Sequence, residues 1–466
     1  MRQPHGVRAT PSTQYTMAQA LRPSRSLGRG SRVVCAIDRM GPDGAALGRA
    51  GGRVIAVPYG APGDEATVEI LEGGREPVLG RIVALRRQAD RVVDPLCPHF
   101  GQCGGCQWQH LDYAAQLQQK TLLVRQALAH PGLRDLEIEP AVGWGPPWGF
   151  RTLLQATAGP SASGSVLGFY AWGGTRVVDV QACPIQHPAN VALLAAVRHG
   201  WPALSGGPRL RGVIARAGAA TGEVLLGLAV AGALDSTGRT AVVRALLDRI
   251  PGLVGILEVC VPRSGHLLTA RRTSLLWGRA WLREEIAGVR YSIPLLAEFP
   301  ANPRALSGLI ELVLATLDAS TADAVVETGA GIGAYTLHLA LGAGRAVGVT
   351  SAALLDVARA NARANRIENC AFYARDAVRA VEKAARSRPV RLAFLHPGET
   401  GLAPGLAPAL RRAGVRRVAY LGRSLRRLGG DAAVLRAAGY RLLRARPVDM
   451  SPHTSRVSVL IAAEAR

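Results

Sequence analysis

The sequence has almost no lysine, few acidic residues and no long apolar run. Lys120 and Lys383 are the only lysines, yet 56 Lys and Arg face 33 Asp and Glu, a net charge of +23 over 466 residues. No stretch approaches the ~18 apolar residues of a membrane span. We therefore expect a non-membrane protein whose arginine-rich surface binds a polyanion such as RNA or DNA. A GC-rich genome would also enrich arginine, and that explanation stays open.

The chain also lacks the marks of a secreted protein. Residues 1–30 are polar and basic, without the apolar block of a secretory signal, and predict a disordered tail in which Met17 offers a second start. Seven cysteines, an odd number, favour reduced thiols or metal ligands over a disulfide framework. These features predict a cytoplasmic protein, and the length predicts two to four domains.

Residues 31–90 predict a small β domain. Short β-rich runs such as "RVVCAI" and "DEATVEILE" are separated by Gly- and Pro-rich segments, including "MGPDGAALGRAGG". About five such strands suit a barrel of the OB type, a frequent platform for single-stranded nucleic acid. A generic β-barrel is the alternative.

The middle of the chain predicts a mixed α and β domain. Apolar residues recur at helical spacing in "DYAAQLQQKTLLVRQALAH", with Asp112 as N-cap. Short strands follow over 150–280, with helical stretches at 190–200 and 239–250 between them.

From about residue 305 strands and helices alternate, with a last helix expected at 431–438, which predicts a doubly wound α/β sheet with its ligand at the carboxyl ends of the strands. The first turn, "ETGAGIGAY", has Gly329, Gly331 and Gly333 where a ligand's close approach needs them. No Gly-Lys-Ser/Thr follows, so this is not a phosphate loop. A nicotinamide site would need an acid at the end of the next strand, where Thr350 stands.

Three cysteines crowd the stretch "CPHFGQCGGCQWQH", which contains Cys97, Cys103 and Cys106, and a fourth, Cys183, lies in "VVDVQACPIQHP". Four thiolates suit either a [4Fe–4S] cluster or a tetrahedral zinc ion, and the spacing favours iron–sulfur only slightly. The other three, Cys35, Cys260 and Cys370, lie in strand-like apolar runs typical of buried, unligated cysteine.

With these motifs, the chain from about residue 31 to the end resembles the RNA (uracil-5-)-methyltransferases of tRNA and ribosomal RNA. "CPHFGQCGGCQWQH" is similar to the family's cluster signature, "LGFYAWGGTRVVDVQACPIQHP" to the segment with the fourth ligand, and "FRTLLQATAG" to its "YRNK" strand. The resemblance implies a TRAM barrel at 31–90, an α+β domain at 91–290 whose four cysteines bind a [4Fe–4S] cluster, and a Rossmann-like class I domain at 291–466 that uses S-adenosylmethionine.

The family's chemistry needs two groups. A Cys thiolate adds to C6 of uracil and makes C5 nucleophilic, and a carboxylate then removes the C5 proton. By resemblance Arg423, in "YLGRSLRRLGGD", stands at the nucleophile position. In "DMSPHTSRVS", Ser458 stands at the base position and Arg456 replaces a His. Neither catalytic group is therefore intact.

The cofactor motifs are only partly retained. Pro300 replaces a Gln, Thr350 the acid that binds the ribose, and His396 an Asp. The matching residues, which the resemblance implies in cofactor binding, are Asn302, Glu327, Gly329, Gly331, Gly333 and Asp376. We expect weakened S-adenosylmethionine binding.

The resulting hypothesis is a monomeric, cytoplasmic RNA-binding protein, on tRNA or ribosomal RNA, with a structural [4Fe–4S] cluster and degenerate methyl transfer. The alternatives are an active RNA methyltransferase with a rearranged site, in which His396 or His453 acts as acid or base, and a non-catalytic ribosome assembly factor.

Overall fold

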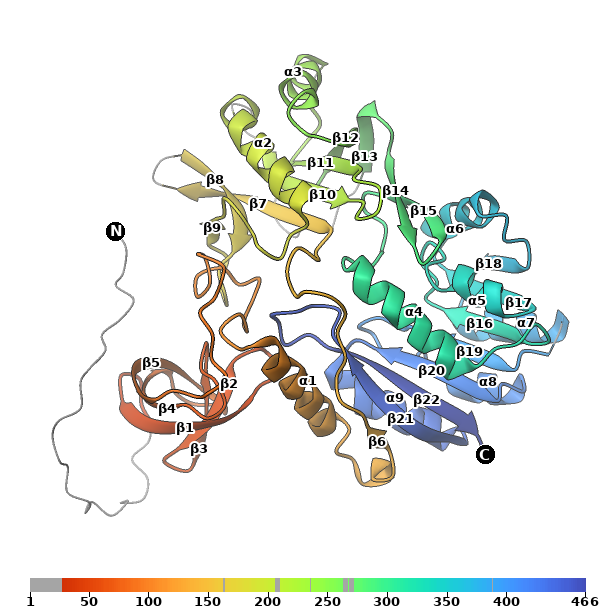
Figure 1. Ribbon diagram of the computed structural model, residues 1–466, viewed down its shortest axis with the longest axis horizontal. Coiled ribbons are helices and arrows are strands. Elements are labelled where there is room, and N and C mark those ends of the chain that lie inside the picture. Colours follow the sequence, from red (N-terminus) through yellow and green to blue (C-terminus); the bar gives the residue numbers. More distant parts are fainter. Residues whose placement is uncertain are drawn as a thin grey trace.

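The computed structural model describes residues 27–466 except 162–163, 206–209, 235, 263–266, 268–271 and 388. The tail predicted at 1–30 therefore lies almost wholly outside the described residues. Figure 1 shows a small barrel, a central sheet and a larger sheet flanked by helices. In the described part no helix is both long enough and apolar enough to cross a membrane.

The first unit is a closed barrel of five strands in the order β1-β2-β3-β5-β4. Its strands alternate between core and solvent, as in β1, where Cys35 and Ile37 are buried between exposed neighbours. One strand was not predicted: β2 lies inside the segment expected to be a turn, because three of the five residues of "ALGRA" are Ala or Gly and none is β-branched. The strands are β1 (Arg32–Met40), β2 (Ala46–Ala50), β3 (Arg53–Val57), β4 (Glu65–Glu72) and β5 (Val78–Arg87).

Helix α1 (Tyr113–Ala127) follows the cysteine segment. The Asp112 carboxylate accepts a hydrogen bond from the Ala115 amide at 2.7 Å, which confirms the predicted N-cap. A 3-10 turn, η1 (Pro131–Leu133), leads to the short strand β6 (Glu137–Ile138).

A seven-stranded, mostly antiparallel sheet has the order β13-β12-β11-β10-β7-β8-β9, and helices α2 and α3 lie beside it (Figure 1). The hairpin of β14 and β15 then leads to the larger sheet. The bounds are β7 (Leu153–Ser161), β8 (Gly164–Tyr170), β9 (Val177–Asp179), α2 (Pro188–Ser205), β10 (Leu210–Ala217), β11 (Val224–Val230), α3 (Ser236–Leu247), β12 (Leu253–Cys260), β13 (Arg272–Gly278), β14 (Trp281–Ile286) and β15 (Val289–Pro294).

The larger sheet has the order β18-β17-β16-β19-β20-β22-β21-β6. Strands β18 to β20 are parallel, β22 is antiparallel to β20, and the chain order reverses at β16, as the doubly wound prediction requires. Helix α9 begins at Leu425, earlier than the 431 expected. The bounds are α4 (Pro303–Leu317), β16 (Ala324–Thr328), α5 (Thr336–Gly342), β17 (Arg345–Thr350), α6 (Ala352–Ala364), β18 (Cys370–Ala374), α7 (Ala377–Ser387), β19 (Leu392–Leu395), α8 (Leu406–Arg412), β20 (Arg417–Gly422), α9 (Leu425–Ala437), β21 (Tyr440–Val448) and β22 (Ser458–Ala465).

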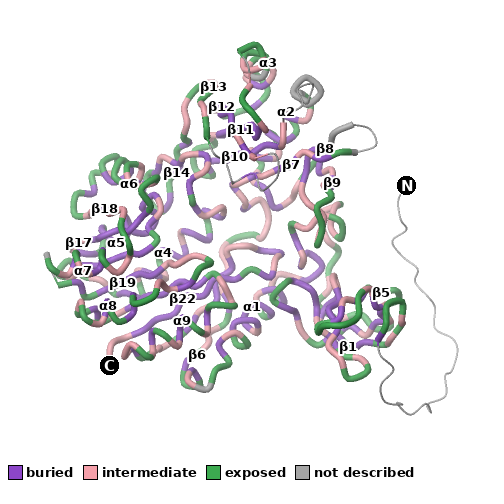
Figure 2. Tube along the Cα trace, turned by 180° about the vertical axis from the view of Figure 1, so that it is seen from behind, coloured by how far each residue is buried: buried purple, intermediate pink, exposed green. Residues whose placement is uncertain are grey.

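Residues from the first third of the chain complete both neighbouring cores. Trp108 is fully buried in the core of the barrel, and its indole N–H donates to the Gly44 carbonyl at 3.0 Å. Val124 of α1 and Leu128, the residue that caps its end, belong to the core of the larger sheet, and β6 pairs with β21 at its edge. Figure 2 shows the buried trace running along the strands, whereas β5 and the outer turns of α3 are exposed.

Candidate functional site

The glycine-rich turn follows β16 at the carboxyl edge of the larger sheet. Gly329 has φ +87°, and a Cβ there would lie 2.2 Å from the His396 carbonyl oxygen, so no other residue fits. The amides of Gly329 and Ala330 donate to the Val349 carbonyl at 3.1 and 2.9 Å. Gly331 and Gly333 also have positive φ, +54° and +94°. The turn is thus built as predicted, close against β17 and the end of β19.

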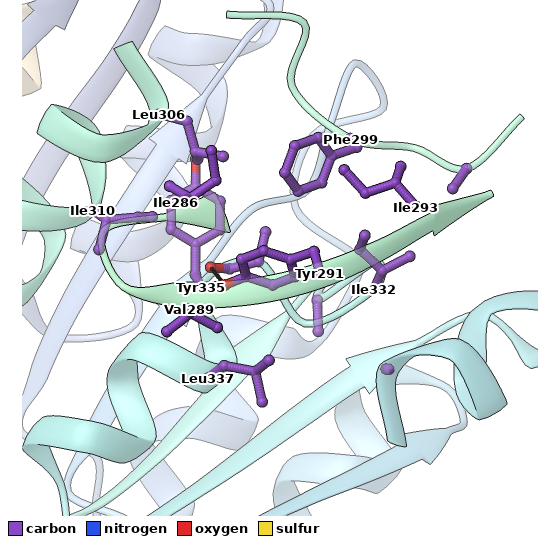
Figure 3. Close-up of a cluster of buried hydrophobic side chains, with 14 of the residues drawn as sticks. Ile286, Val289, Tyr291, Ile293, Phe299, Leu306, Ile310, Ile332, Tyr335 and Leu337 are labelled. Atoms are coloured by element: carbon purple, nitrogen blue, oxygen red, sulfur yellow. Dashed lines mark hydrogen bonds between the residues drawn. The ribbon is translucent and has the colours of Figure 1, made fainter. Parts of the chain in front are cut away.

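An apolar cluster supports this turn from below. Figure 3 shows Tyr291, Phe299, Ile332, Tyr335 and Leu337 together, contributed by β15, the loop after it, the turn and the start of α5. The Tyr291 hydroxyl donates to the Ala334 carbonyl at 3.1 Å. This packing holds the glycine-rich turn in place at the edge of the sheet.

Glu327 is the buried carboxylate of β16, only 1% exposed. It accepts a hydrogen bond from the Thr336 hydroxyl, while its Oε1 has no hydrogen-bond partner among the described residues. Burial raises the pKa of Glu327 to about 8, against the opposing effect of Thr336. At neutral pH this carboxyl is therefore mostly protonated.

Three further predicted cofactor positions are engaged with the protein itself. The Thr350 hydroxyl donates to the Gly331 carbonyl at 2.6 Å. The exposed Asp376 accepts from the amides of Val378 and Arg379 at 3.0 and 3.2 Å, at the start of α7. Asn302 is the N-cap of α4 and also donates from Nδ2 to the Met450 carbonyl at 3.4 Å.

Arg423 and Ser458 both lie at this edge. Gly422, the last residue of β20, pairs with Val459, and Arg423 and Ser458 are the residues directly beyond that pair. Ser458 is buried, whereas Arg423 is exposed and forms an ion pair with Glu298 at 3.2 Å. The edge therefore presents a guanidinium paired to a carboxylate beside a buried hydroxyl.

His396 lies at the end of β19, half-buried, with its ring near those of Tyr335 and Phe394. Burial, and then the charge of Arg423, lowers the pKa of His396 to about 4, so the imidazole is neutral at physiological pH. It adds no charge to this edge.

The loop 449–457, which leads to Ser458, is held by α1 and the cysteine segment. Lys120 and Asp449 form a fully buried ion pair at 2.6 Å. Gln116 donates to His453 Nδ1 at 3.1 Å, His453 Nε2 donates to the Pro147 carbonyl at 3.0 Å, and Trp148 stacks on the ring. Burial lowers the pKa of His453 to about 4. The ring is packed and fully bonded, which argues against the acid or base role considered for it. Lys120 and Gln116 were not predicted as site residues, because nothing in their local sequence distinguishes them from ordinary helix residues.

The four predicted cysteine ligands come together from two segments. Cys106 packs with Phe150, Ile185 and the partly buried Cys183. Burial raises the pKa of the Cys106 thiol to about 12 and that of Cys183 to about 11, and the charges of neighbouring cysteines act in the same direction. In the described part no group of three or more His, Cys, Asp or Glu side chains is compact enough to hold a metal ion. The cysteines are thus near enough to act on one another's charge, but the described residues show no preformed metal site.

No protein-family model matches the sequence. Among curated proteins, an uncharacterized RNA methyltransferase of Gloeobacter violaceus is 31% identical over 448 residues, 94% of this chain and 97% of the relative. One of Bacillus cereus is 28% identical over 430 residues, 90% of this chain and 93% of the relative.

Among solved structures, the tRNA (uracil-54, C5)-methyltransferase of Pyrococcus abyssi in complex with S-adenosyl-L-homocysteine matches with a TM-score of 0.71. Its identity is 20%, and the match covers 92% of this chain and 99% of that one. The chain belongs to this family of RNA methyltransferases, as its motifs indicated, and has a methyltransferase fold over nearly its whole length.

Proposed function

We propose that the protein is an RNA-binding member of the uracil-C5 branch of its family in which methyl transfer has been lost. The observation that carries the proposal is the Arg423–Glu298 ion pair at the end of β20. The resemblance assigns position 423 to the nucleophile and position 458 to the base, and each lies directly beyond the Gly422–Val459 pair at which the pairing of β20 with β22 ends.

The residues present cannot perform the reaction. A guanidinium keeps its proton and has no lone pair for C6 of uracil, and the Ser458 hydroxyl is far too weak an acid to act as an ionised base. All seven cysteines lie among the described residues, and none lies at the carboxyl edge of the sheet. Cys370 begins β18 and so lies at its amino end.

S-adenosylmethionine should bind weakly. The chain retains the methyltransferase fold, and its structural neighbour from Pyrococcus abyssi carries S-adenosyl-L-homocysteine. Here, however, the Thr350 hydroxyl is bonded to Gly331, the Asp376 carboxylate caps α7, and Pro300 has no amide to offer. Losing one hydrogen bond to a charged acceptor costs about 1.5–3 kcal/mol, or about tenfold or more in affinity.

We assign a [4Fe–4S] cluster to Cys97, Cys103, Cys106 and Cys183. The chemistry of the donors supports the assignment, because the charges of Cys183, Cys103 and Cys97 all raise the pKa of Cys106, whose side chain is buried. Each thiolate of such a cluster binds a different iron, so its four sulfurs are spread more widely than around one ion. Bound there, the cluster would cross-link the two cysteine segments, and the chain's own residues would supply only the thiolates and their burial.

The division of the chain follows the same proposal. The barrel at 31–90 acts as an OB-like TRAM domain for RNA, the part at 91–290 carries the cluster, and 291–466 is the degenerate methyltransferase domain, in a cytoplasmic monomer. The basic character supports an RNA ligand, tRNA or ribosomal RNA. Arg456 is exposed near Arg151, whose pKa is lowered by burial and then by the charge of Arg456, while the charges of Cys183 and Cys106 act in the opposite direction.

The decisive experiment incubates the full-length protein with unmodified tRNA or ribosomal RNA and labelled S-adenosylmethionine, followed by nucleoside analysis. We expect salt-sensitive RNA binding but no 5-methyluridine, and no covalent adduct with 5-fluorouridine RNA. 5-Methyluridine from the wild-type protein would overturn the proposal in favour of an active enzyme. Co-sedimentation with ribosomal particles would favour an assembly role over tRNA binding.

A further inference from the structure

A loop of the barrel, Pro58–Gly60 between β3 and β4, lies against the cysteine segment. His110, four residues after Cys106, donates from Nε2 to the Gly60 carbonyl at 2.9 Å, and both groups are buried. The loop is thereby fixed beside the three cysteines at 97–106.

Tyr59, within this loop, has an unusual backbone. Its φ is +64°, in the left-handed region that bulky residues avoid. Such strain persists where the surroundings impose it, and it concentrates at functional sites. The backbone turns the ring onto Phe100, at 5.1 Å between centroids, and Trp172, at 6.4 Å.

Both ring partners belong to the cysteine site. Phe100 lies between Cys97 and Cys103 in sequence, and Trp172 follows Ala171, whose backbone forms a bridge with Cys103. The Tyr59 side chain therefore lies on the Cys103 side of the site. The pKa of Tyr59 is raised by burial and then by the charge of Cys103, which agrees with this placement.

The Tyr59 hydroxyl is buried and has no hydrogen-bond partner among the described residues. A buried hydroxyl without a partner is costly, and nearly all such groups in proteins find one. A thiolate sulfur accepts hydrogen bonds, and a metal-bound cysteine keeps its negative charge. The Cys103 sulfur already accepts a hydrogen bond from the Gly105 amide at 3.4 Å, and a thiolate sulfur can accept more than one. The Tyr59 hydroxyl, which has no acceptor of its own, lies on the side of the site where such a second donor would come from.

We propose that Tyr59 is a positioning residue of the metal centre: its hydroxyl donates a hydrogen bond to the sulfur of cluster-bound Cys103, so that the barrel tunes the cluster. This inference rests on the [4Fe–4S] assignment. Hydrogen bonds to cluster sulfurs stabilise the more negative, reduced state and so raise the reduction potential.

The test uses full-length protein purified anaerobically, with iron and sulfide content and a spectroelectrochemical titration as readouts. Tyr59→Phe keeps both ring contacts and removes only the hydroxyl. We expect it to retain iron while its midpoint potential falls, with reduction disfavoured by up to about tenfold, or about 59 mV for a one-electron couple. Tyr373→Phe, in β18 of the larger sheet, is the control and should keep the wild-type potential.

A second variant keeps the inference testable if Tyr59→Phe loses its cluster. 3,5-Difluorotyrosine at position 59 keeps the shape and makes a stronger donor, so the potential should rise above the wild-type value. An unchanged potential in either variant overturns the role of Tyr59 while leaving the cluster in place. Wild-type protein with zinc and no iron overturns the cluster assignment, and the Tyr59 inference with it.

Discussion

The buried Lys120–Asp449 pair gives the sharpest stability prediction. Both side chains are 0% exposed, the Nζ–Oδ1 distance is 2.6 Å, and Lys120 also donates to the Ser451 carbonyl at 3.0 Å. Lys120→Met has similar length but leaves the Asp449 carboxylate buried without its cation. Breaking a buried pair in this way costs about 3–5 kcal/mol.

Hydrogen exchange measured by mass spectrometry tests this locally, which suits a chain of several units that need not unfold in one step. In Lys120→Met, protection in α1 and in the loop 449–457 should fall about 10²-fold or more, as 3 kcal/mol or more implies. Lys383→Met is the matched control: Lys383 is the other lysine, exposed on α7, and its loss should change stability by less than about 0.5 kcal/mol.

A double variant separates the pair from the packing. Lys120→Met with Asp449→Leu replaces both charges by apolar groups, and such replacements are often neutral. We expect hydrogen-exchange protection in this double variant to be closer to the wild-type value than in Lys120→Met alone. The coupling energy between the two substitutions should therefore be opposite in sign to the stability lost in each single variant. Wild-type protection in Lys120→Met would refute the view that this pair holds the loop.

Three more predictions follow from the sites described. Arg423→Cys alone should give no 5-methyluridine, because the base that removes the C5 proton is still missing at Ser458. 5-Methyluridine from this variant would mean that another residue supplies the base. The pKa of Glu327 is raised in the folded protein from its ordinary 4.5 to about 8, so its contribution to stability is complete below about pH 4.5 and is lost as the pH rises through about 8, in all about 5 kcal/mol. Melting temperatures measured from pH 5 to 9 should therefore fall more steeply for the wild type than for Glu327→Gln. Parallel curves for the two proteins would contradict a buried, protonated carboxyl. Replacing the exposed Arg86 and Arg87 of β5 by Glu should weaken RNA binding and flatten its salt dependence. The control replaces the exposed Arg363 of α6 and Arg386 of α7 by Glu and should change neither property. Equal effects of the two variants in filter binding would mean that net charge, and not the barrel, binds the RNA.

Sequence patterns predicted most of the fold, because the signals were local. Asp112 caps α1, the strands of the larger sheet alternate with helices, and Gly329 lies where only glycine fits. Strand β2 was not predicted, because "ALGRA" has no strand propensity of its own. This segment becomes a strand because it pairs with β1 and β3. The early start of α9 escaped because Arg426 and Arg427 break the apolar periodicity.

The sites were predictable only where a motif is contiguous. The cysteines and the glycine-rich turn stand out in the sequence, but the Arg423–Glu298 pair joins residues 125 apart and depends on how two loops meet. Tyr59 gives no signal either, since its interest comes from a left-handed backbone and a buried hydroxyl that only the fold reveals.

The pairing of β6 with β21 has a consequence for how the chain is made. The edge strand of the larger sheet, and the lysine that neutralises Asp449, are both synthesised more than 300 residues before their partners. During translation Lys120 and the apolar face of α1 stay exposed until residues 440–466 have been synthesised. Contacts so distant in sequence also form slowly. A fragment starting at residue 291 would carry the opposite defect, an uncapped β21 edge and a lone buried Asp449. The nascent chain is thus most vulnerable to aggregation and proteolysis just before residues 440–466, which begin with β21, leave the ribosome.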